Sequence, residues 1–178
     1  MMLPLPPDES LPEPVVQRLK ERPPINVWRM LGHVPQCVIP ITDMAKALYQ
    51  GTLSPREREV GILRHGARLG SPYEVHQHRL LALGIGMTEE EIKEVTDLTR
   101  LPDFSEREKM ICVIADKMEA NGNLDDETFA KGQAEFGASQ FVEVLLLVSF
   151  YACIGRFVNG TRLSVEKSNP LAGRASPN

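Results

Sequence analysis

The sequence predicts an all-α protein, and three observations carry that prediction. First, a helix-starting pattern, Ser or Thr followed three residues later by Glu, recurs along the chain. In such a capping box the hydroxyl and the glutamate each bind an unpaired backbone N–H group. Second, proline and glycine stand at the first and the terminating positions of the same segments. Third, no sustained apolar–polar alternation bounded by turn dipeptides indicates a strand. The boxes are Ser54–Glu57, Ser71–Glu74, Thr88–Glu91 and Ser105–Glu108.

Prolines dominate the start of the chain. Nine of the 14 prolines lie in the first forty residues, and a proline inside a helix removes a hydrogen-bond donor and clashes with the preceding turn. We therefore expect an arm over residues 1–22 and two or three proline-broken short helices over 23–52. The helical segments expected there are Ile25–Leu31 and Ile41–Tyr49, with the prolines at 23, 24, 35 and 40 between them.

From residue 53 onward the capping boxes define longer helices. Pro55 and Pro72 stand at first helical positions, where a missing N–H group costs no helical hydrogen bond. Gly70, Gly84 and Gly122 stand where helices should end. The predicted helices cover residues 55–69, 72–83, 89–99, 105–120, 125–136 and 139–158.

Size and composition indicate one globular domain. The 178 residues are 42% hydrophobic and 25% charged, and a net charge of −4 argues against nucleic-acid binding, which needs a basic face. The most apolar run, Val144–Ile154, is shorter than the roughly 20 residues of a membrane span, so we expect a buried core helix and no membrane partner. The start resembles no secretory signal, and the three cysteines form no C-x-x-C pair. Both features favour the cytoplasm.

A faint internal repeat links two of the boxes. Leu53–Glu57 and Phe104–Glu108 are offset by 51 positions, and an apolar helix follows each. After the first copy comes the polar segment YEVHQH, residues 73–78, whereas the second copy has no histidine at the equivalent place. If this is a duplication, only the first half kept polar chemistry, although capping boxes alone could produce most of the similarity.

The same segment holds the candidate site. On a helix, Glu74 and His78 are i and i+4 and share one face, with Ser71 one further turn back. Glu59 lies on the preceding helix, which a short link should fold back antiparallel. A carboxylate beside an imidazole fixes the tautomer of the imidazole and raises its pKa, as general acid–base catalysis requires.

Structural interpretations of these residues stay open. Glu74 is the third helical residue of a capping box, and Glu59 belongs to a run of alternating charges. For His78, the pattern alone favours a core-edge histidine bonded to Glu74. His76 projects away from His78, so the pair is a poor chelate and no metal site is predicted. The remaining imidazole and indole groups are interpreted as structural or surface residues: His33, His65 and Trp28.

Residues 53–95, LSPREREVGILRHGARLGSPYEVHQHRLLALGIGMTEEEIKEV, resemble the carboxymuconolactone decarboxylase family, which includes alkylhydroperoxidase D. The likeness extends over roughly residues 25–165, to members with a Y-E-x-x-x-H motif. It implies an alkylhydroperoxidase D-like helical bundle that assembles as a homo-oligomer, a dimer, trimer or hexamer. We accordingly divide the chain into an N-terminal arm (1–22), one helical domain (23–165) and a C-terminal tail (166–178).

Within that family the sequence departs from the peroxidase branch. That branch has a glutamate, two cysteines and a histidine at the spacing that Glu59, Ser71, Glu74 and His78 have here, so both cysteines are replaced. Disulfide-cycling peroxidase chemistry needs both thiols. The cysteines of this chain lie outside the motif and are poor substitutes: Cys37, Cys112 and Cys153.

The resemblance to the decarboxylase branch implies a lyase without metal or organic cofactor. Its substrate would be a small carboxylated lactone or an acid from aromatic-compound catabolism, and loss of CO₂ would leave an enolate-like species that needs a proton donor. Glu59, Glu74 and His78 are the predicted proton-transfer residues. The predicted substrate-binding residues are Ser71, Tyr73 and Arg64. The guanidinium of Arg64, or of an arginine from another subunit, would bind the substrate carboxylate. Two alternatives stand beside this prediction: a non-catalytic oligomeric binding protein and, less favoured, a thiol peroxidase.

Overall fold

The computed structural model describes residues 3–177, and within them the chain is helical and contains no strand, which confirms the predicted fold class. Two short 3-10 turns, η1 and η2, accompany eight helices. In chain order the elements are η1 (Asp8–Ser10), α1 (Glu13–Lys20), α2 (Asn26–Met30), η2 (Leu31–His33), α3 (Pro35–Tyr49), α4 (Pro55–Arg68), α5 (Pro72–Gly84), α6 (Glu89–Thr96), α7 (Glu106–Asn121) and α8 (Asp126–Gly160).

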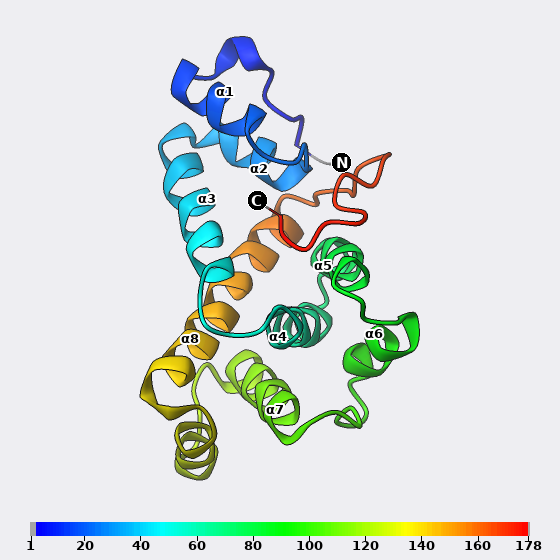
Figure 1. Ribbon diagram of the computed structural model, residues 1–178. Helices are drawn as coiled ribbons and strands as arrows, with labels where there is room; N and C mark the ends of the chain where they lie inside the picture. The colour runs from blue at the N-terminus through cyan, green and yellow to red at the C-terminus, as the bar shows by residue number, and fades with distance from the viewer. Residues whose placement is uncertain (1–2, 178) are drawn as a thin grey trace.

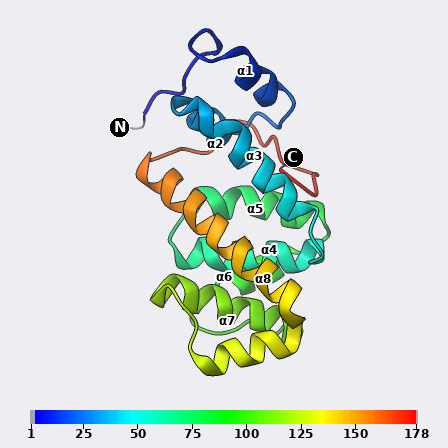
Figure 2. The same ribbon diagram turned by 90° about the vertical axis from the view of Figure 1, so that its left-hand side faces the viewer.

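Helix α4 lies at the centre of the molecule. It contacts α5, α6, α7 and α8, and Figure 1 shows it enclosed by them. The view in Figure 2 shows α8 running diagonally across the stack formed by α7, α4 and α5, with α1 to α3 at the opposite end from α7. Because neighbours cover α4 on nearly every side, polar residues in its middle are buried with the apolar ones.

Three of the four predicted capping boxes form. At Ser54, Thr88 and Ser105 the hydroxyl accepts a hydrogen bond from the backbone N–H group three residues on, and the glutamate at that position accepts one from the cap. The predicted ends of α4, α5 and α7 agree with the structure to within one residue. Helix α6 ends at Thr96 instead of residue 99 because Asp97 has extended backbone and its carbonyl accepts a hydrogen bond from Arg64.

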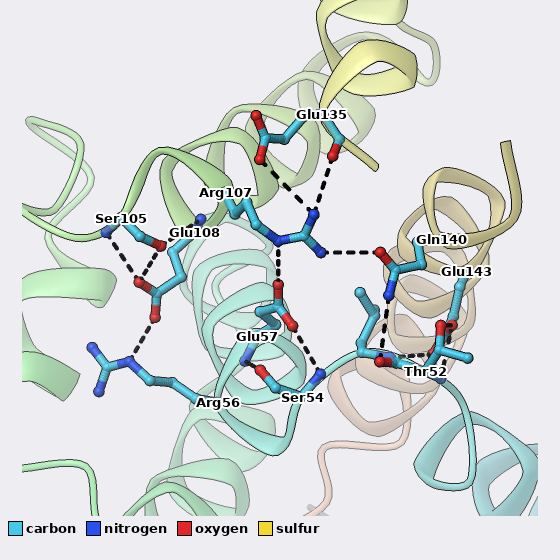
Figure 3. A network of polar contacts seen from close by, with 11 residues as sticks. Thr52, Ser54, Arg56, Glu57, Ser105, Arg107, Glu108, Glu135, Gln140 and Glu143 are labelled. Carbon is cyan, nitrogen blue, oxygen red and sulfur yellow. Dashed lines mark hydrogen bonds and ion pairs between the residues drawn. The ribbon is translucent and has the colours of Figure 1, made fainter. Parts of the chain in front are cut away.

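Two of these boxes are joined to each other. Arg56 Nε donates to Glu108 at 2.6 Å, and Arg107 Nε donates to Glu57 at 2.8 Å, so each capping glutamate also binds the arginine of the other box (Figure 3). Arg107 reaches further, to the side chain of Gln140 on α8. The network connects the starts of α4 and α7 with the second part of α8.

Helix α8 contains a break where the sequence predicts one. The predicted helices 125–136 and 139–158 are separated at Gly137, whose φ of 65° and ψ of 171° are not helical. A residue with a side chain adopts this backbone conformation only at a cost, so glycine is required here. The two parts of α8 therefore take different directions.

The N-terminal region is more regular than predicted. Pro35 and Pro40 do not separate helices: α3 begins at Pro35 and continues through Pro40. Pro40 removes the hydrogen bond to the carbonyl of Gln36, but both residues lie on the exposed side of α3, where water can bind that carbonyl. The predicted arm packs on the same helix, with Val15 buried and the Arg18 guanidinium donating to the Thr42 hydroxyl at 2.9 Å.

Helix α8 is long and apolar enough, by length and composition, to cross a membrane. The core helix of a soluble protein meets the same test, and half of the most apolar window of α8 is buried inside the protein. Val144, Leu147 and Tyr151 pack there against residues of α4 and α7, as expected of the buried core helix that the sequence predicts.

Candidate functional site

The candidate site is built on the antiparallel pair α4 and α5. The link between them turns at Gly70, which has a φ of 65°, and Ser71 N–H then donates to the Gly66 carbonyl at 2.9 Å. This turn brings Glu59 of α4 opposite His78 of α5. The distance from Glu59 Oε2 to His78 Nδ1 is 2.8 Å, and both side chains are at least 95% buried. The structure thus brings together two residues that the sequence predicts to share a site.

Tyr49, at the end of α3, completes the environment of Glu59. Its hydroxyl donates to Glu59 Oε1 at 2.8 Å, so both carboxylate oxygens are hydrogen-bonded. Burial first, and the Glu59 carboxylate next, raise the pKa of Tyr49 well above its ordinary value, and the phenol remains a donor. Tyr151 of α8 stands edge-on to the His78 ring, with 4.8 Å between the ring centroids. Helices α3, α4, α5 and α8 together fix the orientation of the imidazole.

Glu74 faces the other nitrogen of His78, one helical turn away on α5. Its Oε2 lies 3.7 Å from His78 Nε2, and its side chain is about 95% buried. The predicted capping box Ser71–Glu74 is therefore wrong: the Ser71 side chain caps nothing, and its buried hydroxyl has no partner among residues 3–177. The carboxylate is directed to the imidazole instead of the helix end.

Burial and charge tune the two titrating groups in the same direction. Burial raises the pKa of Glu74 to about 7; the charge of His78 lowers this pKa and the charge of Glu59 raises it. Burial alone would lower the pKa of His78, but the charge and the hydrogen bond of Glu59, together with the charge of Glu74, raise it above its ordinary value. Near neutral pH, the pair therefore holds a proton available for transfer.

A small cavity adjoins Glu74 and His78. It offers about 20 Å³ to the centres of water-sized molecules, room for about one water. Two of its lining side chains carry buried polar atoms that have no hydrogen-bond partner in the described chain: Trp28 Nε1, a donor, and Gln77 Oε1, an acceptor. Its lining residues are Ile25, Val27, Trp28, Tyr73, Glu74, Gln77, His78, Phe150, Tyr151, Ile154, Leu171 and Pro177.

The predicted substrate-binding residues are only partly assembled there. Tyr73 lines the cavity, whereas Ser71 is buried outside its lining. Arg64 is not brought to the cavity. Its guanidinium binds both carboxylate oxygens of Asp116, at 2.8 and 2.7 Å. It also donates to three backbone carbonyls at the end of α6 and in the link to α7, those of Val95, Asp97 and Arg100. All three nitrogens of the Arg64 guanidinium therefore have partners within the fold.

The other histidines and the cysteines lie elsewhere. His65 Nε2 is 3.0 Å from a carboxylate oxygen of Glu119, and His33 contacts the carbonyl of Pro4. No cysteine lines the cavity, and burial raises the pKa of the Cys112 thiol to about 12. Among residues 3–177 no group of three or more His, Cys, Asp or Glu side chains is arranged to hold a metal ion.

Sequence reasoning missed four contributors: Tyr49, Gln77 and Tyr151 altogether, and Trp28 as part of the cavity. Tyr49 and Tyr151 lie on helices that reach the site only through tertiary packing, so no local spacing points to them. Gln77 stands between His76 and His78 and was the one accessible signal, because it shares the polar segment of α5.

The raised pKa of Glu74 predicts a pH-dependent stability. Between about pH 4.5 and 6.5 the folded chain binds more protons than the unfolded chain, so the free energy of unfolding should fall as pH rises, by about 2–3 kcal/mol. His78 adds little below about pH 6, because an unfolded histidine is mostly protonated there and the folded pKa is higher still. Its contribution is lost above pH 6.5 as the folded form titrates. Glu74→Gln should remove the fall between pH 5 and 6, measured by urea unfolding at these two pH values, with Glu90→Gln as an exposed control. Parallel curves for Glu74→Gln and the wild type would show that Glu74 titrates normally.

Residues 40–116, which contain Glu59, Glu74 and His78, match the model of the carboxymuconolactone decarboxylase family. No curated protein sequence matches the chain. Among solved structures, the chain resembles the alkylhydroperoxidase AhpD core of an uncharacterized peroxidase-related protein from Ralstonia eutropha JMP134. The identity is 22% over 98% of this chain and 97% of that one, with a TM-score of 0.81.

A second solved structure, an uncharacterized peroxidase-related protein from Silicibacter sp. TM1040, is 15% identical over 97% of this chain and 95% of that one, with a TM-score of 0.84. At these identities the two structures establish a shared fold, an AhpD-like helical fold, and no shared activity. The family match covers the segment that contains Glu59, Glu74 and His78. Residues 40–116 of the chain thus resemble the carboxymuconolactone decarboxylase family, and the whole chain has the AhpD-like helical fold.

Proposed function

We propose that the protein is a lyase that acts on a small carboxylated lactone or a related acid from aromatic-compound catabolism, with His78 as the proton donor. The observation that carries the proposal is the buried arrangement Glu59–His78–Glu74 beside a cavity with unpaired polar atoms. A carboxylate on Nδ1 and a second, partly protonated carboxyl near Nε2 form a proton-transfer unit with no other evident task.

The proposed reaction uses these positions. The bond between the departing carboxylate and its carbon breaks, CO₂ leaves, and the electron pair remains on the substrate as an enolate conjugated with the lactone carbonyl. His78 Nε2–H then donates its proton to the carbon, and Glu59 stabilises the imidazolium up to that transfer. Glu74, with a pKa near 7, is placed to return a proton to Nε2 for the next turnover. The raised pKa of His78, caused mainly by Glu59, favours the charged form of the donor.

The tyrosine and tryptophan groups serve binding in this proposal. Tyr49 holds Glu59 in place, and the Trp28 and Gln77 atoms without partners offer one donor and one acceptor to an oxygen-rich ligand. We further propose a cytoplasmic homo-oligomer. Val142 and Leu146 of α8 are exposed beside a groove next to α3, and burial of that apolar surface would favour contact between copies.

The test is turnover of a panel of carboxylated lactones by the purified protein in D₂O, followed by CO₂ release and by NMR of the product. We expect stoichiometric CO₂ and one deuterium on the carbon that lost the carboxylate. Binding of the lactones without CO₂ release would instead support the non-catalytic alternative. Consumption of a hydroperoxide with oxidation of the cysteines, in the absence of lactone turnover, would support the peroxidase alternative.

A further inference from the structure

The C-terminal segment 161–177 returns from the end of α8 and covers the cavity. Figure 1 shows it passing between α2 and α5. Leu171 is 99% buried, and both Leu171 and Pro177 line the cavity. The backbone of Arg174 approaches α5 so closely that a side chain at Gly84 would come within 2.0 Å of the Arg174 carbonyl oxygen. The segment is thus a fitted cover over the candidate site.

Glu166 fastens this cover through its carboxylate. Tyr73 Oη donates to Glu166 Oε1 at 2.8 Å, and the backbone N–H of Asn26 donates to the same oxygen. Gln77 Nε2 donates to the other oxygen, Oε2. Three donors from α2 and α5 therefore converge on one carboxylate, each as a charge-assisted hydrogen bond.

These donors are positioned by the domain and not by the segment that they bind. Tyr73 and Gln77 are one turn apart on α5, and the Val27 N–H donates to Tyr73 Oη at 3.1 Å, which fixes the phenol against α2. Burial, and after it the charge of Glu166, raise the pKa of Tyr73 well above its ordinary value, so the phenol stays protonated. The arrangement would persist if the segment moved away.

The donors also adjoin the acid–base residues. Tyr73 precedes Glu74, Gln77 precedes His78, and all four side chains line the same cavity. The cavity itself has room for about one water, so an organic ligand enters only when the covering segment is displaced. Displacement of Glu166 and Leu171 would expose three unpaired donors and apolar space together.

We propose that Asn26 N–H, Tyr73 Oη and Gln77 Nε2 form a binding subsite for a ligand carboxylate, and that Glu166 occupies this subsite as an internal stand-in. The entering carboxylate takes the place of Glu166, and the covering segment is released as it binds. In catalysis the subsite would anchor the carboxylate of the substrate, and this role rests on the proposed function. Whether the subsite exists can be tested by carboxylate binding alone, without any turnover.

The test uses Glu166→Ala in the full chain, a change that removes a –CH₂–COO⁻ fragment, and acetate, which has the size and charge of that fragment. Melting temperatures are measured in rising sodium acetate against sodium chloride of equal ionic strength. We expect acetate to stabilise the variant beyond chloride, with half-saturation at a concentration at least about tenfold lower than in the wild type. In the wild type, the tethered Glu166 carboxylate competes at an effective concentration of millimolar order or above.

Two variants serve as controls. Lys167→Ala changes the exposed neighbour of Glu166 and should respond to acetate as the wild type does. Tyr73→Phe in the Glu166→Ala background removes one donor and should weaken acetate binding about tenfold. The proposal is overturned if acetate stabilises Glu166→Ala no more than chloride, or if Tyr73→Phe leaves the acetate effect unchanged.

The wild type provides a second measurement that does not depend on how well Glu166→Ala folds. High acetate should speed amide hydrogen exchange in residues 163–174 relative to chloride, because the ligand displaces the covering segment. Unchanged exchange at saturating acetate would contradict the proposal. Neither measurement involves turnover, so a protein inactive on every lactone would still show whether the subsite exists.

Discussion

His78→Gln should lower kcat for the proposed decarboxylation about 10²–10⁴-fold, the usual contribution of a positioned general acid. The imidazole lies between the two carboxylates of the site, with Nδ1 at 2.8 Å from Glu59 and Nε2 at 3.7 Å from Glu74. Glutamine keeps a polar side chain near Glu59 but carries no titrating proton, so the enolate would take its proton from water. The measurement is CO₂ release at saturating substrate, with circular dichroism to confirm that the variant is folded.

A matched control lies two residues away on the same helix. His76→Gln changes an imidazole that does not line the cavity, and it should leave kcat within about twofold of the wild type. Glu59→Gln should lie between the two, because His78 keeps its place but loses the charge that raises its pKa. If His78→Gln retained wild-type kcat on a substrate that the protein turns over, the proton donor would have to be another group.

Arg64→Met should reduce the free energy of unfolding by about 3–5 kcal/mol, the cost of breaking a buried, fully bonded charge pair. The Arg64 side chain is 2% exposed and binds Asp116 in bidentate fashion. Its remaining donor binds the carbonyls of Val95, Asp97 and Arg100 at the end of α6 and after it, and methionine would leave the buried Val95 carbonyl without this donor. Urea unfolding of the variant and the wild type gives the difference.

Arg68→Met is the control for this substitution. Arg68 binds the same Asp116 carboxylate at 2.8 Å, but its side chain is one-third exposed. Its loss should therefore cost less than about 1 kcal/mol, as is usual for exposed ion pairs. Equal effects of the two substitutions would mean that the carbonyl contacts of Arg64 contribute nothing. A binding role for Arg64 at the cavity would instead appear as lost ligand affinity in a variant of normal stability.

The sequence was most informative where a structure depends on neighbours along the chain. A capping box needs only residues three apart, and Ser54, Thr88 and Ser105 start helices where the pattern predicts them. Gly137 likewise marks the break in α8, because a positive φ is a property of one residue. Glu59 and His78 could be paired in advance because they lie on two helices joined by a short link.

The same pattern failed at Ser71 for a physical reason. Glu74 has the spacing of a capping glutamate, yet His78 on the same helix and Glu59 opposite create a buried polar site, and Glu74 turns toward it. The spacing of a local motif cannot predict whether Glu74 binds the helix end or faces His78, because the outcome depends on which residues of α4 pack against α5. The prediction for Arg64 has the same weakness. A guanidinium that fits the carboxylate of a substrate fits the carboxylate of Asp116 as well.

The rest of the site comes from segments far apart in the chain. Trp28, Tyr49, Tyr151 and Glu166 stand on α2, α3, α8 and the C-terminal segment, and they meet only after the whole chain has folded. Glu166 is one acidic residue in a polar stretch, so nothing in its surroundings in the sequence distinguishes it. Contacts of this range follow from tertiary packing and cannot be obtained from spacing.

The exchanged arginines at the starts of α4 and α7 have a consequence for symmetry. Arg56 and Arg107 are the second residues of α4 and α7, and Glu57 and Glu108 are the third. Each arginine binds the glutamate of the other helix, which is the reciprocal contact that a twofold axis produces in a dimer. In this protein both halves of the reciprocal contact lie within a single chain. The symmetry does not extend to chemistry: 51 positions after Glu59 and His78 stand methionine and phenylalanine. If the two boxes are copies of one ancestral segment, one copy has kept the candidate proton-transfer groups and the other has kept the helix start and its contact.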